Sequence, residues 1–193
     1  DGVLEDVTWK GINFLFCERC GYPVPGKHGL CHMDTYAEHK GLKLPYCGGW
    51  HDAGDMSQQT VQTAETVESL LELAAERRES TLLCQRLMEE ALWGLEFIFR
   101  TRFGDGYRAT SLGLIRWTDG KIGNDDDASN VRVHNHALEN FICAGVFALA
   151  AECLGDYDRE LAWRCAGAAE EDFRFAQERY QTHGMELPLP WEH

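Results

Sequence analysis

Five stretches of the sequence repeat apolar residues at helical spacing, and this repetition limits the fold more than any other feature. They cover residues 3–20, 57–79, 82–102, 138–149 and 162–180. Short connections join the second stretch to the third and the fourth to the fifth, which indicates two antiparallel helical hairpins. Residues 103–133, between the hairpins, are rich in Gly, Asp and Asn and leave room for short strands. The pattern predicts an all-α fold.

Helical hairpins stacked around an axis form a toroid, and their long connections gather on one face, where a site can form. Five helices are too few to close such a ring. The final residues, PLPWEH, add no capping element. We therefore expect an αα-hairpin toroid of which residues 1–193 form only a part, with the rest of the same polypeptide completing it.

Size and charge narrow the class of protein. With 193 residues, 44% of them hydrophobic, the chain can bury one core, which predicts one domain. The chain begins at Asp1, so a targeting signal is absent or already removed, and the compartment cannot be read from it. No uninterrupted apolar run approaches the ~20 residues that cross a bilayer, so we expect a soluble chain without a membrane partner. The net charge of -14 argues against a nucleic-acid partner, although acidity also simply favours solubility.

The loop between the first two helical stretches concentrates metal-binding and acidic side chains. Residues 21–55 carry two cysteines, four histidines and four acidic residues. Four of the eight cysteines lie in apolar helical stretches and are expected in the core, namely Cys84, Cys143, Cys153 and Cys165. The other four lie in or beside the loop, namely Cys17, Cys20, Cys31 and Cys47. A disulfide is open to these four in an oxidising compartment, whereas their mixture with histidine favours a metal.

Three segments of this region resemble glycoside hydrolase family 9. They are GGWHDAGD at 48–55, FCERCGYPV at 16–24 and LCHMD at 30–34; YDRELAWRCAGAAEEDFRFA at 157–176 also resembles a hairpin of that family. The resemblance implies an (α/α)6 barrel that hydrolyses β-linked glycans, with residues 1–193 as the N-terminal portion of its catalytic domain. It also favours a periplasmic or secreted location.

The resemblance implies an inverting mechanism with two separated carboxyl groups. Carried over by position, Asp55 is the general base and Asp52 helps to hold the nucleophilic water. The Ala-Gly step between them permits a tight turn. The alternative for Asp55 is a structural one, as the N-cap of a helix that starts near Ser57.

A zinc-containing subset of the family has a structural zinc near the catalytic loop. The resemblance places its ligands at Cys20, Cys31, His32 and His51. Two thiolates and two imidazoles make a closed tetrahedral site that would staple the loop. Cys17 and His28 compete for these places, because the C-x2-C spacing of Cys17 and Cys20 is also common in zinc sites.

Two departures from the family pattern limit what is carried over. Segments common in family endoglucanases are replaced by YRATSLGL at 107–114 and VHNHALEN at 133–140, so an oligosaccharide or another β-glycan is as open as cellulose. The general-acid Glu of the family lies beyond this chain. A catalytically silent, zinc-stapled toroid that binds glycans or a protein partner remains the alternative.

Further residues are candidates for carbohydrate and cation binding. Aromatic and imidazole rings that would face sugar are Trp50, Trp117, His134 and His136. Trp50 is equally open to a core role, and the two histidines to capping the following helix. The acidic loop at 123–129, GNDDDAS, offers oxygen ligands for calcium, with a plain solvated loop as its alternative.

Overall fold

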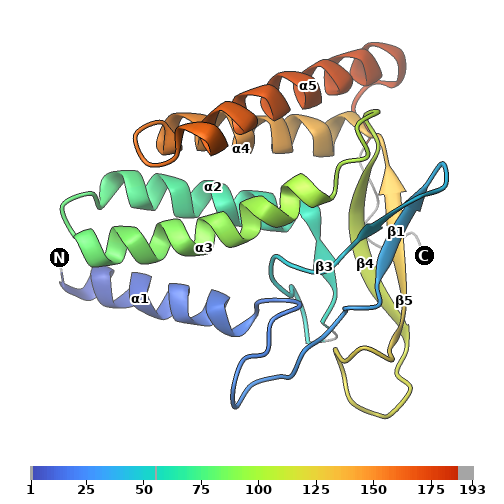
Figure 1. Ribbon diagram of the computed structural model, residues 1–193, viewed down its shortest axis with the longest axis horizontal. Coiled ribbons are helices and arrows are strands. Elements are labelled where there is room, and N and C mark those ends of the chain that lie inside the picture. Colours follow the sequence, from blue (N-terminus) through green and yellow to red (C-terminus); the bar gives the residue numbers. More distant parts are fainter. Residues whose placement is uncertain (1, 55, 187–193) are drawn as a thin grey trace.

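Figure 1 shows the computed structural model, which describes residues 2–54 and 56–186. Within these residues, five helices form a row beside two small antiparallel sheets. The helices are α1 (Gly2–Cys17), α2 (Thr60–Glu76), α3 (Thr81–Arg100), α4 (Ala137–Leu154) and α5 (Arg159–His183). The strands are β1 (Tyr36–His39), β2 (Leu42–Pro45), β3 (Gln58–Gln59), β4 (Arg108–Arg116) and β5 (Ala128–His134).

The helices pack as the two hairpins that the sequence predicts. Helix α2 packs on α3, and α4 packs on α5. Contacts between α2 and α4, and between α1 and α3, place the helices in the spatial order α1, α3, α2, α4, α5 (Figure 1). The five predicted helices are confirmed, with ends that shift by five residues at most.

A β-hairpin lies inside the loop at residues 21–55, where the sequence analysis expects no strands. Strands β1 and β2 pair antiparallel through a two-residue turn, with His39 opposite Leu42. The turn residues Lys40 and Gly41 both have positive φ, at 47° and 82°. Two successive residues of this kind match the hairpin turn that follows the right-handed twist of the strands.

The second sheet joins the start of α2 to the segment between the hairpins. Its order is β3-β4-β5, and Gln58 lies opposite Leu112, which in turn lies opposite Val131. Strands between residues 103 and 133 were predicted and are confirmed. The helical frame is as predicted, and it carries two small sheets.

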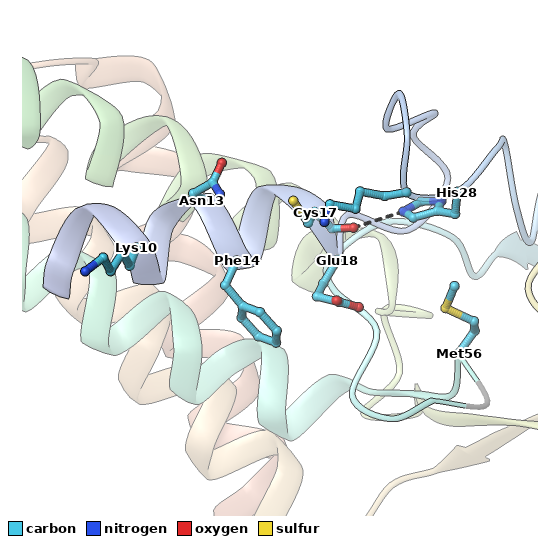
Figure 2. A pocket seen from close by; sticks show the side chains of 8 residues that line it. Lys10, Asn13, Phe14, Cys17, Glu18, His28 and Met56 are labelled. Atoms are coloured by element: carbon cyan, nitrogen blue, oxygen red, sulfur yellow. Dashed lines mark hydrogen bonds between the residues drawn. The ribbon is translucent and has the colours of Figure 1, made fainter. Parts of the chain in front are cut away.

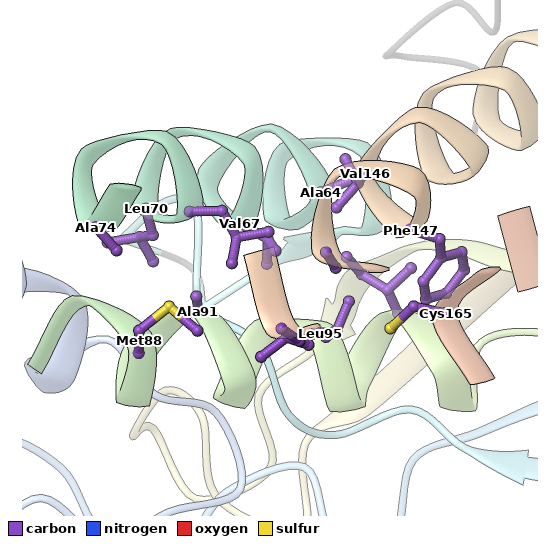
Figure 3. Packing of buried hydrophobic residues seen from close by; sticks show 14 of the residues in the cluster. Ala64, Val67, Leu70, Ala74, Met88, Ala91, Leu95, Val146, Phe147 and Cys165 are labelled. Carbon is purple, nitrogen blue, oxygen red and sulfur yellow. The ribbon is translucent and has the colours of Figure 1, made fainter. Parts of the chain in front are cut away.

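Figure 3 shows the main core, which fills the space between the helices. Large side chains such as Leu71, Leu87 and Phe147 have no exposed surface there. Of the cysteines predicted in the core, Cys143 and Cys165 are fully buried, whereas Cys84 and Cys153 pack against the core from its edge. Burial raises the pKa of the Cys143 and Cys165 thiols to about 11, so both are neutral packing groups at ordinary pH.

Helix α4 has the length and apolar composition of a membrane span. Half of that span is buried inside the fold, between α2 and α5. Its first turns also bury Glu139 and Asn140, and the Asn140 amide donates to the Gly106 carbonyl at 2.9 Å. One helix of this kind is weak evidence for a membrane, since core helices have the same composition.

The backbone of Gly94 in α3 packs closely against the ring of Trp50. A Cβ at Gly94 would come 2.5 Å from the Trp50 ring and 2.6 Å from the Val67 side chain. Overpacking of this kind costs about 1–3 kcal/mol. We expect Gly94→Ala to lower the free energy of unfolding measured by urea titration, although alanine favours a helix over glycine by about 1 kcal/mol.

The matched control is Gly145→Ala, another glycine inside a helix, where a Cβ would meet no atom within 4 Å. It should leave the stability unchanged or raise it by up to about 1 kcal/mol. Equal stability of the two variants would contradict the tight contact between Gly94 and Trp50.

Candidate functional site

The candidate site is built on a short backbone pairing between the end of α1 and the GGWH segment. The Cys20 N–H donates to the Gly49 carbonyl at 3.0 Å, and the His51 N–H donates to the Glu18 carbonyl at 2.9 Å. Arg19 and Trp50 form an antiparallel bridge between these bonds. Side chains alternate between the two faces of an extended segment, so neighbours in this pairing point to opposite sides.

Trp50 and Arg19 share the inner face. Trp50 has 5% of its surface exposed and belongs to the main core, and its Nε1 donates to a Glu90 carboxylate oxygen at 3.4 Å. Arg19 donates to both oxygens of the same carboxylate, at 2.8 and 3.2 Å. Trp50 is therefore a core residue, which was the alternative considered for it, and the prediction that its ring faces the sugar is wrong.

The outer face carries the residues predicted to bind zinc. The ligand atoms of all four lie within 4.8 Å of one another, and the four residues are buried: Cys20, Cys31, His32 and His51. The Cys20 sulfur lies 3.4 Å from His32 Nδ1, and the Cys31 sulfur lies 3.5 Å from His51 Nε2. In a tetrahedral zinc site, adjacent S and N ligand atoms lie about 3.5 Å apart. The donor types and their separations fit a structural zinc ion.

Protonation of the two thiols is unequal. Hydrogen bonds, first with Cys20 and then with His32, His51 and the Gly21 N–H, together lower the pKa of the Cys31 thiol to about 2, although burial acts in the opposite direction. Burial raises the pKa of the Cys20 thiol, and the Cys31 side chain raises it further. A thiolate already present at Cys31 suits a metal ligand, since metals bind the deprotonated thiol.

The second nitrogens of the two imidazole rings point away from the sulfurs. Within residues 2–54 and 56–186, neither His32 Nε2 nor His51 Nδ1 has a hydrogen-bond partner, and both atoms are buried. The Glu18 carboxylate lies 3.9 Å from His51 Nδ1. Histidine ligands of metals usually donate this second N–H to a carboxylate, so Glu18 is placed to orient His51.

The competing ligands lie outside the four-residue cluster. His28 has one ring nitrogen 2.7 Å from the Gly29 carbonyl and the other 3.1 Å from the Cys17 carbonyl, so both nitrogens face backbone oxygens. Cys17 itself is half-buried at the end of α1. Cys47 packs beside Gly21, in the same small cluster of sulfur atoms as Cys20 and Cys31.

Both glycines before Trp50 are required by the backbone. Gly48 and Gly49 have φ of 119° and 63°, where a side chain is strained. A Cβ at Gly49 would lie 2.9 Å from the Thr63 hydroxyl and 3.0 Å from the Phe97 ring. The motif therefore passes directly over helices α2 and α3, and the Gly48 carbonyl accepts from the Gln58 side chain.

The acidic turn follows the zinc-type cluster without a break. Asp52 is exposed, and its Oδ1 accepts from the Ser57 hydroxyl at 2.5 Å, while its N–H donates to the Ser57 carbonyl at 2.9 Å. Asp55 lies outside the residues that the structure describes. Helix α2 begins at Thr60 with Gln59 as its N-cap, so the capping role considered for residue 55 does not apply to this helix.

A cavity of about 490 Å³ lies on the α1 side of this turn (Figure 2). Its walls come from α1, from residues 27–28 and from Met56, and they include the Glu18 and His28 side chains. Met56 has a φ of 59°, a left-handed conformation that is uncommon for residues other than glycine. The sequence analysis did not predict the contact of Ser57 with Asp52 or the place of Met56 in the cavity wall, because neither residue belongs to a recognisable motif.

The structure does not bring the remaining sugar-facing candidates together. They lie at opposite ends of the β4–β5 hairpin, because β5 pairs with β4 so that His134 lies opposite Arg108, far along the strand from Trp117. Trp117 is 49% exposed, directly after β4. His134 ends β5 and stacks on His136, with ring centroids 4.5 Å apart. His136 takes the N-cap position of α4 but makes no side-chain capping bond there, and its Nδ1 lies 3.7 Å from the buried Glu139 carboxylate. Burial raises the pKa of Glu139, a residue that the sequence analysis missed.

Comparisons with known proteins identify the family of the chain. A family profile described as Glycosyl hydrolase family 9 matches residues 5–188. Endoglucanase D of Acetivibrio thermocellus is 25% identical over 199 residues, which cover 90% of this chain and 32% of that protein. The chain thus spans about a third of the length of the curated relatives it matches.

Solved structures are similar over the same region. The crystal structure of a metagenome-derived glycoside hydrolase family 9 endoglucanase superposes with a TM-score of 0.74 at 27% identity, over 90% of this chain and 36% of that one. A Zn-binding triple mutant of the family 9 endoglucanase J30 superposes with a TM-score of 0.74 at 20% identity, over 96% of this chain and 41% of that one. Because the family profile matches residues 5–188, which are almost the whole chain, the chain belongs to glycosyl hydrolase family 9.

Proposed function

We propose that this chain provides the general-base side of a glycoside hydrolase that cleaves β-linked glycans with inversion. The observation that carries the proposal is the GGWHDAGD segment. Its Trp is anchored in the core, its His belongs to a buried metal-type cluster and its first Asp is exposed to solvent. The endoglucanases among its relatives support hydrolysis of O-glycosyl bonds.

In the proposed mechanism, Asp55 takes a proton from the attacking water and Asp52 orients that water. The Ser57 hydroxyl bonded to Asp52 Oδ1 limits the rotation of this carboxylate, which leaves its other oxygen for water. A general acid from outside this chain protonates the leaving oxygen. In inverting enzymes, the two carboxyl groups stand roughly 6.5–9.5 Å apart to admit the water.

The rest of the same polypeptide is proposed to complete an (α/α)6 barrel around residues 1–193. Both outer helices of the row expose large apolar side chains. On α1 these are Val3, Leu4, Val7 and Phe14, and on α5 they are Trp163, Phe173 and Tyr180, each at least 49% exposed. Apolar surfaces of this kind favour burial by further helices, and the relatives are about three times as long as this chain.

Zinc is proposed as the metal of the cluster, with a structural role. All four ligand positions are filled by protein atoms, so a bound ion has no open position for substrate. When bound, the ion would fix His51, whose neighbour Asp52 begins the acidic turn. Trp117, His134 and His136 are proposed to contact the glycan, because their rings are at least partly exposed, with Trp117 at one end of the β4–β5 hairpin and the two histidines at the other.

The general-base assignment predicts the effect of Asp55→Asn in the full-length protein. We expect kcat on a β-glucan to fall by about 10²–10⁴-fold, because the amide cannot accept the proton from water, while substrate binding is retained. Asp52→Asn should lower kcat by a smaller factor. Asp34→Asn, the same change at an exposed position of the same loop, is the control and should leave kcat unchanged. Near-normal turnover by folded Asp55→Asn protein would remove the assignment.

The inverting mechanism predicts which anomer appears first. NMR spectra recorded in the first minutes of hydrolysis of a β-linked oligosaccharide should show the α-anomer, because water attacks the face opposite to the leaving group. Early release of the β-anomer would require a covalent intermediate and would exclude the mechanism proposed here.

The structural zinc predicts metal content near one zinc ion per chain, measured by mass spectrometry after purification without added metal. Cys20→Ser, Cys31→Ser, His32→Ala and His51→Ala should each lower the zinc content and the melting temperature, because loss of one ligand opens a closed site. The control is Cys17→Ser, whose sulfur lies outside the four-residue cluster, and it should keep the zinc.

His51 separates a structural role from a role in substrate binding. Loss of both zinc and turnover in His51→Ala protein would support a structural zinc ion that holds the loop in place. Full zinc content with loss of turnover alone would show that His51 contacts the substrate instead. Zinc-free wild-type protein with a disulfide between Cys20 and Cys31 would contradict the metal proposal as a whole.

A further inference from the structure

The carboxylate of Glu90, in helix α3, lies beneath the pairing of residues 18–20 with residues 49–51 and bonds to both sides of it. Its Oε1 accepts from Arg19 Nη2 at 2.8 Å, and its Oε2 accepts from Arg19 Nε at 3.2 Å and from Trp50 Nε1 at 3.4 Å. Arg19 and Trp50 are the two partners of the β-bridge in that pairing. The Glu90 side chain has no exposed surface. One buried carboxylate therefore connects both segments of the pairing to helix α3.

The Arg19 guanidinium is enclosed, so it has little freedom to find another partner. Its side chain is 7% exposed. It lies over the rings of Phe16, Tyr22 and Trp93, at 5.0, 5.6 and 4.7 Å from their centroids, in contacts that favour a cation. Loss of one partner of a buried ion pair leaves the other charge uncompensated. The position of Arg19 therefore depends on the charge of Glu90.

We propose that Glu90 is a positioning residue for the metal-type cluster, acting through Arg19 and Trp50. Each of these two residues directly precedes a cluster residue, namely Cys20 and His51. The N–H groups of Cys20 and His51 make the hydrogen bonds of the pairing, so a shift of the pairing moves their side chains with it. In the described part of the chain, the Glu90 carboxylate hydrogen-bonds to Arg19 and Trp50 and to none of the four cluster residues.

The physical reason lies in the precision that a closed metal site needs. Ligand atoms must keep their separations, so the backbone that carries them must be held by groups outside the site. A carboxylate on a core helix provides such a support from the inner face. The effect on zinc rests on the proposed structural zinc, whereas the effect on the pairing does not.

A role in core stability alone is the alternative, and a second buried carboxylate provides the control for it. Asp172 in α5 is 2% exposed and accepts from Arg108 and, at 2.9 Å, from Arg102. It resembles Glu90 in its burial and in its arginine partners. Because it joins α5 to the start of β4 and not to the pairing, Asp172→Asn should lower stability without moving the metal-type cluster.

Zinc release from the full-length protein to a coloured chelator, below the melting temperature of every variant, tests the effect on the cluster. Glu90→Gln keeps the size of the side chain and an acceptor oxygen but removes the charge. We expect it to release zinc about tenfold faster than the wild type or more, since groups that orient metal ligands change metal affinity by about 10–100-fold. Asp172→Asn and Glu89→Gln should keep the wild-type rate. Glu89 lies 3.9 Å from Arg19, but its side chain is 53% exposed, and exposed pairs contribute little.

Hydrogen exchange tests the pairing itself and needs no zinc. In full-length protein freed of metal by a chelator, the amides of Cys20 and His51 should exchange faster in Glu90→Gln than in the wild type. The reason is that their hydrogen bonds open more often once the inner face is no longer held. Mass spectrometry of peptides that contain these amides measures the difference, and Asp172→Asn should show none.

Arg19→Lys gives a second variant in case Glu90→Gln does not fold. Lysine retains the positive charge but cannot donate to both carboxylate oxygens through a rigid fork. Zinc release and amide exchange should therefore both become faster in Arg19→Lys, as in Glu90→Gln.

The two measurements separate the possible outcomes. Wild-type rates of zinc release and of exchange in folded Glu90→Gln or Arg19→Lys protein would overturn the proposal. Faster exchange with unchanged zinc release would overturn it too, because the pairing would then move without the cluster. Equal acceleration in Asp172→Asn would reduce Glu90 to general core stability. If the wild-type protein contains no zinc, the structural zinc fails, and exchange still decides whether Glu90 holds the pairing.

Discussion

The pairing of residues 18–20 with residues 49–51 is the interaction on which the candidate site depends. It consists of a single β-bridge, between Arg19 and Trp50, yet it determines the direction in which these two side chains and those of Cys20 and His51 point. Because side chains alternate along extended backbone, Arg19 and Trp50 turn inward to Glu90, and Cys20 and His51 turn outward to the metal-type cluster. One pairing thus fixes a core anchor and two of the proposed metal ligands together.

The same pairing explains the order of residues in GGWH. The two glycines let the backbone pass over α2 and α3 with positive φ and without a Cβ in the way. Trp50 then fills the space that Gly94 leaves on α3. His51 follows on the other face, so the metal-type cluster can only lie on the side away from the core. A slip of one residue would exchange the two faces and place an imidazole in the core.

Local signals predicted the helices well, because all five repeat apolar residues at helical spacing and four of them pack in two hairpins. They failed where a distant partner decides the structure. The first helix was expected to reach residue 20 but ends at Cys17, because residues 18–20 pair with a segment thirty residues further on. The β1–β2 hairpin had one local signal, a Lys-Gly step between the short segments YAEH and LKLP, which the sequence analysis did not use. The zinc-type ligands were named correctly as a cluster by family resemblance, since their residue types are distinctive even in irregular backbone.

The acidic turn between these supports is held at its two ends and exposed in the middle. On one side His51 is fixed by the pairing, and on the other Gln58 enters the β3–β4 pairing and donates to the Gly48 carbonyl. Asp52 lies between them with its carboxylate oriented by Ser57. A carboxylate that must orient water needs a fixed backbone and an open side chain at once. In the proposed mechanism, this arrangement meets both needs at Asp52, because the contacts of His51 and Gln58 hold the backbone on either side while the Asp52 side chain stays exposed.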